Sequence, residues 1–201
     1  MDELIQLAVS GSLVGVTIFY LLSSLLVKHW VRIDVYKLLL SMAATFLIAI
    51  VGEVVLGKLY YLVMGKPLWQ YHVWPIHDGY TSALNFITWP VYGFYQYCLH
   101  YVLTHKKRQL RPYWLTGLAS GIDGPILEIL ANGFSLLFYQ TFYFYYLPDD
   151  MRHYTSLQVV PLYMVGGVIL SLILQHLRER PPKWIYPIVF YAAGVAFILT
   201  G

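Results

Sequence analysis

Six apolar segments, each long enough or nearly long enough to cross a lipid bilayer as a helix, dominate this chain. A spanning helix needs about 20 apolar residues. Only helices and closed barrels satisfy their backbone hydrogen bonds in lipid, and these continuous apolar runs lack the alternation of barrel strands. The sequence therefore predicts an all-α polytopic membrane protein with six transmembrane helices. They are expected at residues 4–27, 38–57, 83–103, 114–136, 157–177 and 184–200.

The composition agrees with a protein whose main partner is the lipid bilayer. Hydrophobic residues make up 59% of the chain and charged residues 11%, where a soluble domain carries about 25% charged residues. The net charge of +3 gives no reason to expect a nucleic-acid partner. The single cysteine, Cys98, has no partner for an internal disulfide and is expected to be a small buried apolar residue.

The basic residues predict the orientation of the chain. Ten of the thirteen lysines and arginines fall in the first, third and fifth connections between the apolar segments. Because basic loops stay on the cytoplasmic side, both termini are expected on the outer side. The expected location is the plasma membrane or an inner membrane.

An internal repeat lies within the apolar segments. Glu53 is followed by His77 and by Tyr-Thr-Ser at 80–82, and Glu128 is followed by His153 and by Tyr-Thr-Ser at 154–156. A Pro-x-Tyr motif, interpreted as a proline turn, follows each copy at 90–92 and 161–163. This order predicts a duplicated helix–outer loop–helix unit. The expected parts are a first span (1–34), repeat 1 (35–107), repeat 2 (108–180) and a last span (181–201).

Both copies have the same orientation, so a pseudo-two-fold axis along the membrane normal should relate them. At about 1.5 Å per helical residue, Glu53 and Glu128 should both lie in the outer third of a core about 30 Å thick. A carboxylate at that depth is costly and marks a candidate functional site. The candidate ligand or proton-handling residues are Glu53, His77, Asp78, Asn85, Asp123, Glu128, Asn132 and His153.

Several roles for the two glutamates remain open. Each could accept hydrogen bonds from the other repeat and lock the halves together. They could also bind a proton or a cation, or act as acid–base groups on a lipid or isoprenoid. A metal site is disfavoured because the sequence has no Glu-x-x-His or His-x-x-x-His spacing. Asp123 lies near mid-membrane beside Pro125, which is expected to break the helix there. Its side chain is either satisfied by a neighbouring helix or lines a conduit.

The segment 53–92 resembles an uncharacterised polytopic family labelled putative ABC-transporter type IV. The shared elements are a membrane glutamate, Leu-Trp-Gln-Tyr at 68–71, a proline-containing loop with Gly79, and Trp89-Pro90. The second copy departs from this pattern, with Phe-Tyr-Phe at 142–144 where Trp-Gln-Tyr stands at 69–71. The resemblance assigns no role to any residue, and the chain has no phosphate-binding loop.

The first functional hypothesis is binding or transport of a small or amphipathic ligand in an outer-third pocket between the repeats. One alternative is a membrane-embedded acid–base enzyme acting on a lipid or isoprenoid. The other is an accessory subunit of a larger membrane complex, in which side chains would fill the pocket. The sequence identifies neither a substrate nor a cofactor.

Overall fold

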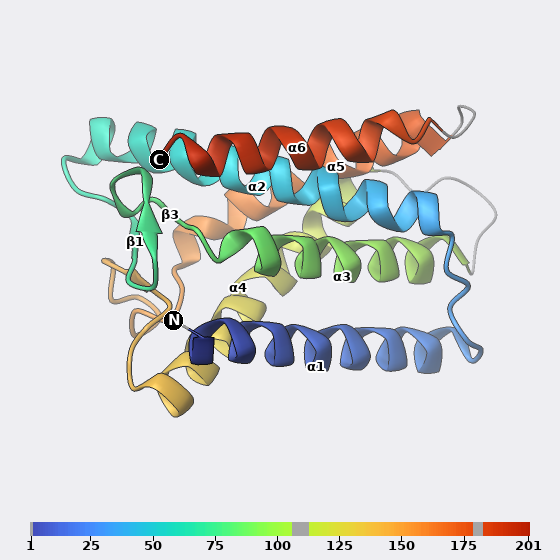
Figure 1. Cartoon of the computed structure of the whole chain (residues 1–201), viewed down its shortest axis with the longest axis horizontal. Helices are drawn as coiled ribbons and strands as arrows, with labels where there is room; N and C mark the ends of the chain where they lie inside the picture. The colour runs from blue at the N-terminus through green and yellow to red at the C-terminus, as the bar shows by residue number, and fades with distance from the viewer. Residues whose placement is uncertain (1, 106–112, 179–182) are drawn as a thin grey trace.

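The computed structural model describes residues 2–105, 113–178 and 183–201, and it confirms the predicted all-α class (Figure 1). Each of the six apolar segments forms a helix, and the helices run lengthwise along the molecule. Their bounds are α1 (Asp2–Val27), α2 (Val35–Met64), α3 (Asn85–His105), α4 (Tyr113–Tyr139), α5 (Val160–Arg178) and α6 (Ile185–Leu199). The expected boundaries at 107–108 and 180–181 lie outside the described residues.

Four stretches of the described chain are long and apolar enough to cross a membrane. They are Ala8–Val27, Val35–Met64, Tyr113–Tyr139 and Leu157–Leu177. The last helix, Ile185–Leu199, is apolar but shorter. The length and composition of these helices are compatible with a membrane location.

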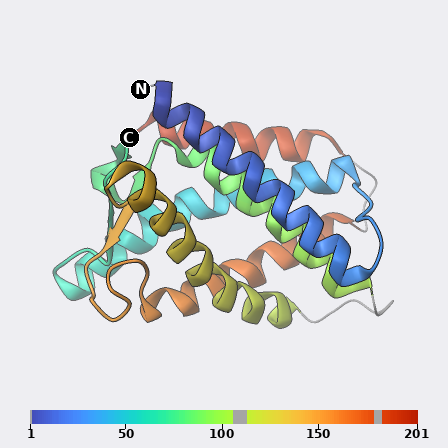
Figure 2. The same ribbon diagram turned by 90° about the horizontal axis from the view of Figure 1, so that it is seen from below.

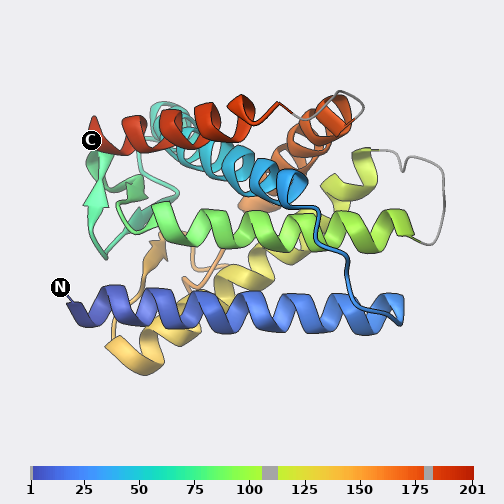
Figure 3. The same ribbon diagram turned by 45° about the vertical axis from the view of Figure 1, so that its right-hand side comes forward.

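The helices pack as two close pairs, α2 against α3 and α4 against α5, with α6 on α2 and α1 along α3 (Figures 2 and 3). Glycines permit both close approaches. A Cβ atom on Gly93 of α3 would lie 2.5 Å from Met42 Cα, and one on Gly117 of α4 would lie 2.8 Å from the Met164 carbonyl oxygen. Both distances are too short for any side chain, so these glycines are packing positions.

Two short antiparallel ladders lie in the two segments predicted to be outer loops, at one end of the bundle. β1 (Trp69–Tyr71) pairs with β4 (Phe144–Tyr146), and β2 (Pro75–Ile76) pairs with β3 (Thr81–Ser82). A short 3-10 turn at His77–Gly79 connects β2 to β3, and another at Leu157–Val159 directly precedes α5. Both chain termini lie at this same end of the molecule (Figure 1).

The three prolines interpreted as turns or helix breakers all lie inside helices. Pro161 is in the first turn of α5, where its missing N–H has no intrahelical acceptor. Pro90 lies inside α3, and the Phe86 carbonyl that it leaves free accepts a hydrogen bond from Tyr191 of α6 at 3.4 Å. α4 continues as a helix through Pro125, so the expected break beside Asp123 is wrong.

Candidate functional site

Glu128 lies on α4 and accepts three hydrogen bonds. Tyr146 of β4 and Tyr163 of α5 donate to its Oε1 at 2.7 and 2.8 Å. Thr155 donates to its Oε2. The hydroxyl of Thr155 therefore holds the carboxylate, which the Tyr-Thr-Ser motif alone did not reveal.

Glu53 lies on α2 in a matching arrangement. Tyr71 of β1 donates to its Oε1, and Thr81 of β3 donates to its Oε2. Asn85, at the start of α3, supplies the third hydrogen bond from Nδ2 to Oε2 at 3.0 Å. Each glutamate is thus held by one strand tyrosine, one threonine of the Tyr-Thr-Ser motif and a third donor.

The donors to each glutamate come from its own half of the chain, so the alternative in which each glutamate bonds the other repeat is wrong. Tyr71 follows Glu53 by 18 residues, and Tyr146 follows Glu128 by 18 residues. Tyr71 and Tyr146 therefore stand at the same distance after their glutamates, whereas the aromatic pattern aligns residues 142–144 with residues 69–71. The two alignments differ by two residues, because aromatic residues fill the whole second loop.

Other contacts join the two halves. β1 and β4 pair directly, with Gln70 opposite Tyr145 at the centre of the ladder. The Tyr143 hydroxyl donates to Asn85 Oδ1 at 2.7 Å. Deeper in the bundle, Gln96 Nε2 donates to Ser120 Oγ at 3.1 Å. The halves therefore meet through their backbone and through amide side chains. Both carboxylates line the space that remains between the halves.

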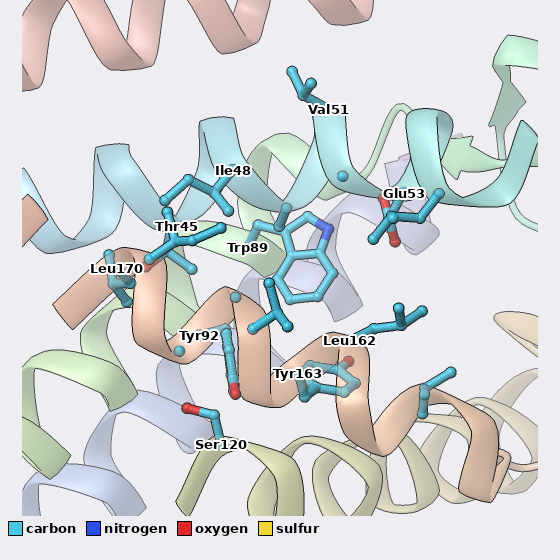
Figure 4. Close-up of a pocket in the computed structure, with 18 of the residues that line it drawn as sticks. Thr45, Ile48, Val51, Glu53, Trp89, Tyr92, Ser120, Leu162, Tyr163 and Leu170 are labelled. Atoms are coloured by element: carbon cyan, nitrogen blue, oxygen red, sulfur yellow. The ribbon is translucent and has the colours of Figure 1, made fainter. Parts of the chain in front are cut away.

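That space is a cavity of about 660 Å³ between α2, α3, α4 and α5 (Figure 4). The volume falls in the range of about 300–1,000 Å³ typical of small-molecule sites. Most of its walls are apolar. Its polar and aromatic lining residues are Thr45, Glu53, Trp69, Tyr71, Trp89, Tyr92, Gln96, Ser120, Glu128, Phe144, Tyr146 and Tyr163.

Four of these lining residues carry a buried polar atom that makes no hydrogen bond among the described residues. The atoms are Trp89 Nε1, Tyr92 Oη, Gln96 Oε1 and Thr45 Oγ1. Gln96 is 1% exposed and Thr45 is 5% exposed. In Figure 4 the Trp89 nitrogen points toward Glu53 and the Tyr92 hydroxyl toward Ser120. An unpaired buried polar group costs about 1–3 kcal/mol. A ligand or a water molecule that forms hydrogen bonds with these atoms would remove that cost.

Three tyrosines of the strand segments stay protonated and act as hydrogen-bond donors: Tyr71 and Tyr146, which line the cavity, and Tyr143 beside them. Burial and the neighbouring Glu53 raise the pKa of Tyr71 well above its ordinary value. Burial and Glu128 do the same to the pKa of Tyr146, and burial raises the pKa of Tyr143. At neutral pH these hydroxyls therefore donate to the site without adding negative charge.

Both asparagines among the predicted site residues are fully buried at the site. Asn85 holds Glu53 and accepts from Tyr143. Asn132 joins α4 to the second loop: Oδ1 accepts from the Tyr143 and Phe144 amides at 3.1 and 3.3 Å, and Nδ2 donates to the Tyr154 carbonyl at 2.8 Å. Asn132 positions β4, and through it Tyr146, rather than touching Glu128.

The two histidines do not bond the glutamates. His77 Nε2 lies 2.9 Å from the Phe197 carbonyl oxygen, and its ring stacks on Phe197. His153 Nδ1 lies 2.7 Å from the Tyr146 carbonyl oxygen, and its Nε2 lies 3.4 Å from Asp149. The described residues contain no group of three or more His, Cys, Asp or Glu that could hold a metal ion.

The two predicted aspartates also lie apart from the glutamates. Asp78 is an exposed loop residue whose side chain is 80% accessible, 3.9 Å from Lys58 Nζ. Asp123 of α4 accepts a hydrogen bond from Tyr95 of α3. Neither residue lines the cavity.

The candidate residues predicted from the sequence did not include the tyrosines that hold the carboxylates, nor the α3 row of Trp89, Tyr92 and Gln96. The spacing of these three residues, at 3 and 4, places them on one helix face, which was a usable signal. The chain matches no protein family, curated protein or solved structure. The resemblance to the putative ABC-transporter type IV family stays a prediction.

Proposed function

We propose that this chain is a six-span integral membrane protein that binds or transports a small or amphipathic ligand in the cavity between two duplicated helical hairpins. The observation that carries the proposal is the open cavity with both glutamates in its wall and unpartnered polar atoms deeper inside.

The duplication is supported by the register of the strand ladder. Trp69 pairs with Tyr146, and Tyr71 pairs with Phe144. If Glu53 corresponds to Glu128, every residue of β1 corresponds to the residue of β4 that stands 75 positions later. Under this correspondence the Trp69–Tyr146 pair and the Tyr71–Phe144 pair change places, and the Gln70–Tyr145 pair stays where it is. A two-fold axis that passes between Gln70 and Tyr145 has the same effect.

The cavity favours ligand binding over the two alternatives. An accessory subunit was expected to fill the pocket with side chains, whereas about 660 Å³ remains open. An acid–base enzyme needs a carboxyl group that is free to exchange a proton with its substrate. Each glutamate in the cavity wall is instead held by three hydrogen-bond donors.

The proposed orientation puts the strand end of the molecule outside the cell. In variants with a single added cysteine, Lys66→Cys should react with a membrane-impermeant maleimide in intact cells, and Trp30→Cys should react only after permeabilisation. Both positions are exposed, and the native Cys98 is 0% exposed, so background labelling should be low. Labelling of Trp30→Cys from outside would reverse the proposed topology.

The binding proposal is tested by filling the cavity. Gly166 of α5 lines the cavity, and no atom lies within 4 Å of a Cβ placed there. Gly166→Phe should therefore fold and occupy the ligand space. We expect a long-chain alcohol carrying a diazirine to label cavity-lining peptides of the wild-type protein in nanodiscs, and to lose at least about nine-tenths of that labelling in Gly166→Phe, which corresponds to about 1.4 kcal/mol or more of binding free energy.

The matched control is Gly133→Phe in α4, where a Cβ also meets no atom within 4 Å but the position does not line the cavity. This variant should keep wild-type labelling. If Gly166→Phe has a lowered thermal midpoint, Gly52→Phe on the opposite wall serves as the second blocking variant, since Gly52 has the same free space. Equal labelling of blocked and control variants would refute binding in the cavity.

A further inference from the structure

The charge of the cavity wall is unbalanced. All six hydrogen bonds to Glu53 and Glu128 run toward the carboxyl oxygens, and their donors are hydroxyls and one amide. Both oxygens of each carboxyl group are thus available as acceptors, which an ionised carboxylate uses fully. No lysine, arginine or histidine belongs to the described cavity lining. Buried charges are normally paired, and the described lining residues supply no cation to pair with the two carboxylates.

Aromatic rings add a second preference for a cation. Trp89 and Tyr92 of α3 lie edge to face with ring centroids 5.6 Å apart, and Tyr92 meets Tyr163 of α5 in the same way at 6.1 Å. All three residues line the cavity, and Figure 4 shows Trp89 and Tyr92 near Tyr163 of α5. Aromatic faces attract ammonium groups, with about 2 kcal/mol or more where water is excluded.

The cavity is open toward the side of the bundle. Val55 of α2 and Val165 and Ile169 of α5 all line it, yet they remain 55%, 57% and 42% exposed. The opening therefore lies between α2 and α5, on a surface that faces lipid if the helices span the membrane. Its apolar rim suits a ligand that carries an alkyl or similar apolar body and enters from the bilayer.

The polar atoms of the cavity are spread out rather than gathered around one point. Thr45 lies eight residues before Glu53 on α2, which places it about 12 Å deeper at about 1.5 Å per residue. A bare metal ion prefers about six oxygen ligands gathered around one point, whereas the polar atoms here are spread along the cavity. An extended organic molecule, with water on the polar atoms that it does not reach, fits this distribution better than an ion does.

We infer that the ligand is a cationic amphipath, with an amine or quaternary ammonium group between Glu53 and Glu128 and an apolar body reaching toward α2 and α5. The inference rests on the proposed binding function and names the chemical class of its ligand. The ammonium group pairs with the carboxylates and contacts the ring faces, while its tail occupies the apolar walls.

A matched series of head groups tests this class. The diazirine alcohol labels the protein in nanodiscs of phosphatidylcholine, which carries no net charge, and decylamine, decyltrimethylammonium, decanol and decanoate compete with it. Concentrations are corrected for partitioning into protein-free nanodiscs. The two cations should compete at about tenfold lower concentration than decanol, a factor that corresponds to about 1.4 kcal/mol. Decanoate should be the weakest competitor.

Variants separate the cavity from the protein surface. Glu128→Gln should remove most of the advantage of the amine over the alcohol. Asp78→Asn removes the same charge from an exposed loop and should leave the advantage unchanged. Decanol equal to decylamine on the wild-type protein would overturn the cationic head group while leaving binding intact. If none of the four compounds competes, the proposed function itself fails.

Discussion

Glu128→Ala should lower the thermal midpoint of the purified protein strongly. The substitution leaves the Tyr146, Tyr163 and Thr155 hydroxyls without their acceptor. Each buried donor left unpaired costs about 1–3 kcal/mol, and the three donors together should cost at least about 3 kcal/mol. For a chain of this length that loss corresponds to a midpoint about 6–12 °C lower.

Glu128→Gln should behave differently. Its Oε1 can still accept from Tyr146 and Tyr163, so only the contact with Thr155 must rearrange, and the midpoint should change by a third of the alanine effect or less. Ligand retention should nevertheless be lost, because the amide carries no charge. Asp149→Asn, at a carboxylate that is 73% exposed, is the control and should change neither property. Alanine and glutamine variants that match the parent in both assays would show that this carboxylate has no role.

Asn132→Ala should destabilise the second loop by a comparable amount. The side chain is 0% exposed and binds two backbone amides and one backbone carbonyl. Alanine leaves all three groups unpaired in a buried place, and we expect a loss of about 3 kcal/mol. Because β4 carries Tyr146, the ladder between the halves should loosen as well.

Hydrogen exchange shows which part of the Asn132→Ala variant is destabilised. Amide exchange at Tyr143 and Phe144 should accelerate in Asn132→Ala, whereas amides in the middle of α1 should exchange as in the parent protein. Unchanged exchange at both loop amides would contradict the role given to Asn132. A uniform acceleration across all helices would instead indicate general unfolding.

The helices could be predicted from the sequence because long apolar runs leave the backbone no alternative in lipid. Both glutamates could be identified for a related reason, since a carboxylate in such a run needs a partner. The partners themselves could not be predicted. Tyr71 and Tyr146 reach their glutamates only because β1 and β4 pair at one register, and short strands in aromatic loops give no periodic signal.

For the two histidines, the sequence suggested a shared site that the structure does not contain. His77 and His153 follow the glutamates at nearly equal intervals, and repetition suggested a shared site. The structure places them on backbone carbonyl groups, where they hold the loop ends. A repeated residue can therefore preserve a loop conformation as readily as a chemical role. The asparagines illustrate this as well, since Asn85 bonds a glutamate and Asn132 bonds only backbone.

Native mass spectrometry of the protein released from nanodiscs tests the central claim most directly, because it detects whatever occupies the cavity without choosing a probe. The wild-type protein and Gly133→Phe should each retain a small amphipathic molecule of the same mass, and Gly166→Phe should have lost it. Retention of that molecule by Gly166→Phe at the wild-type level, or its absence from the wild-type protein, would contradict a ligand-binding cavity between the two hairpins.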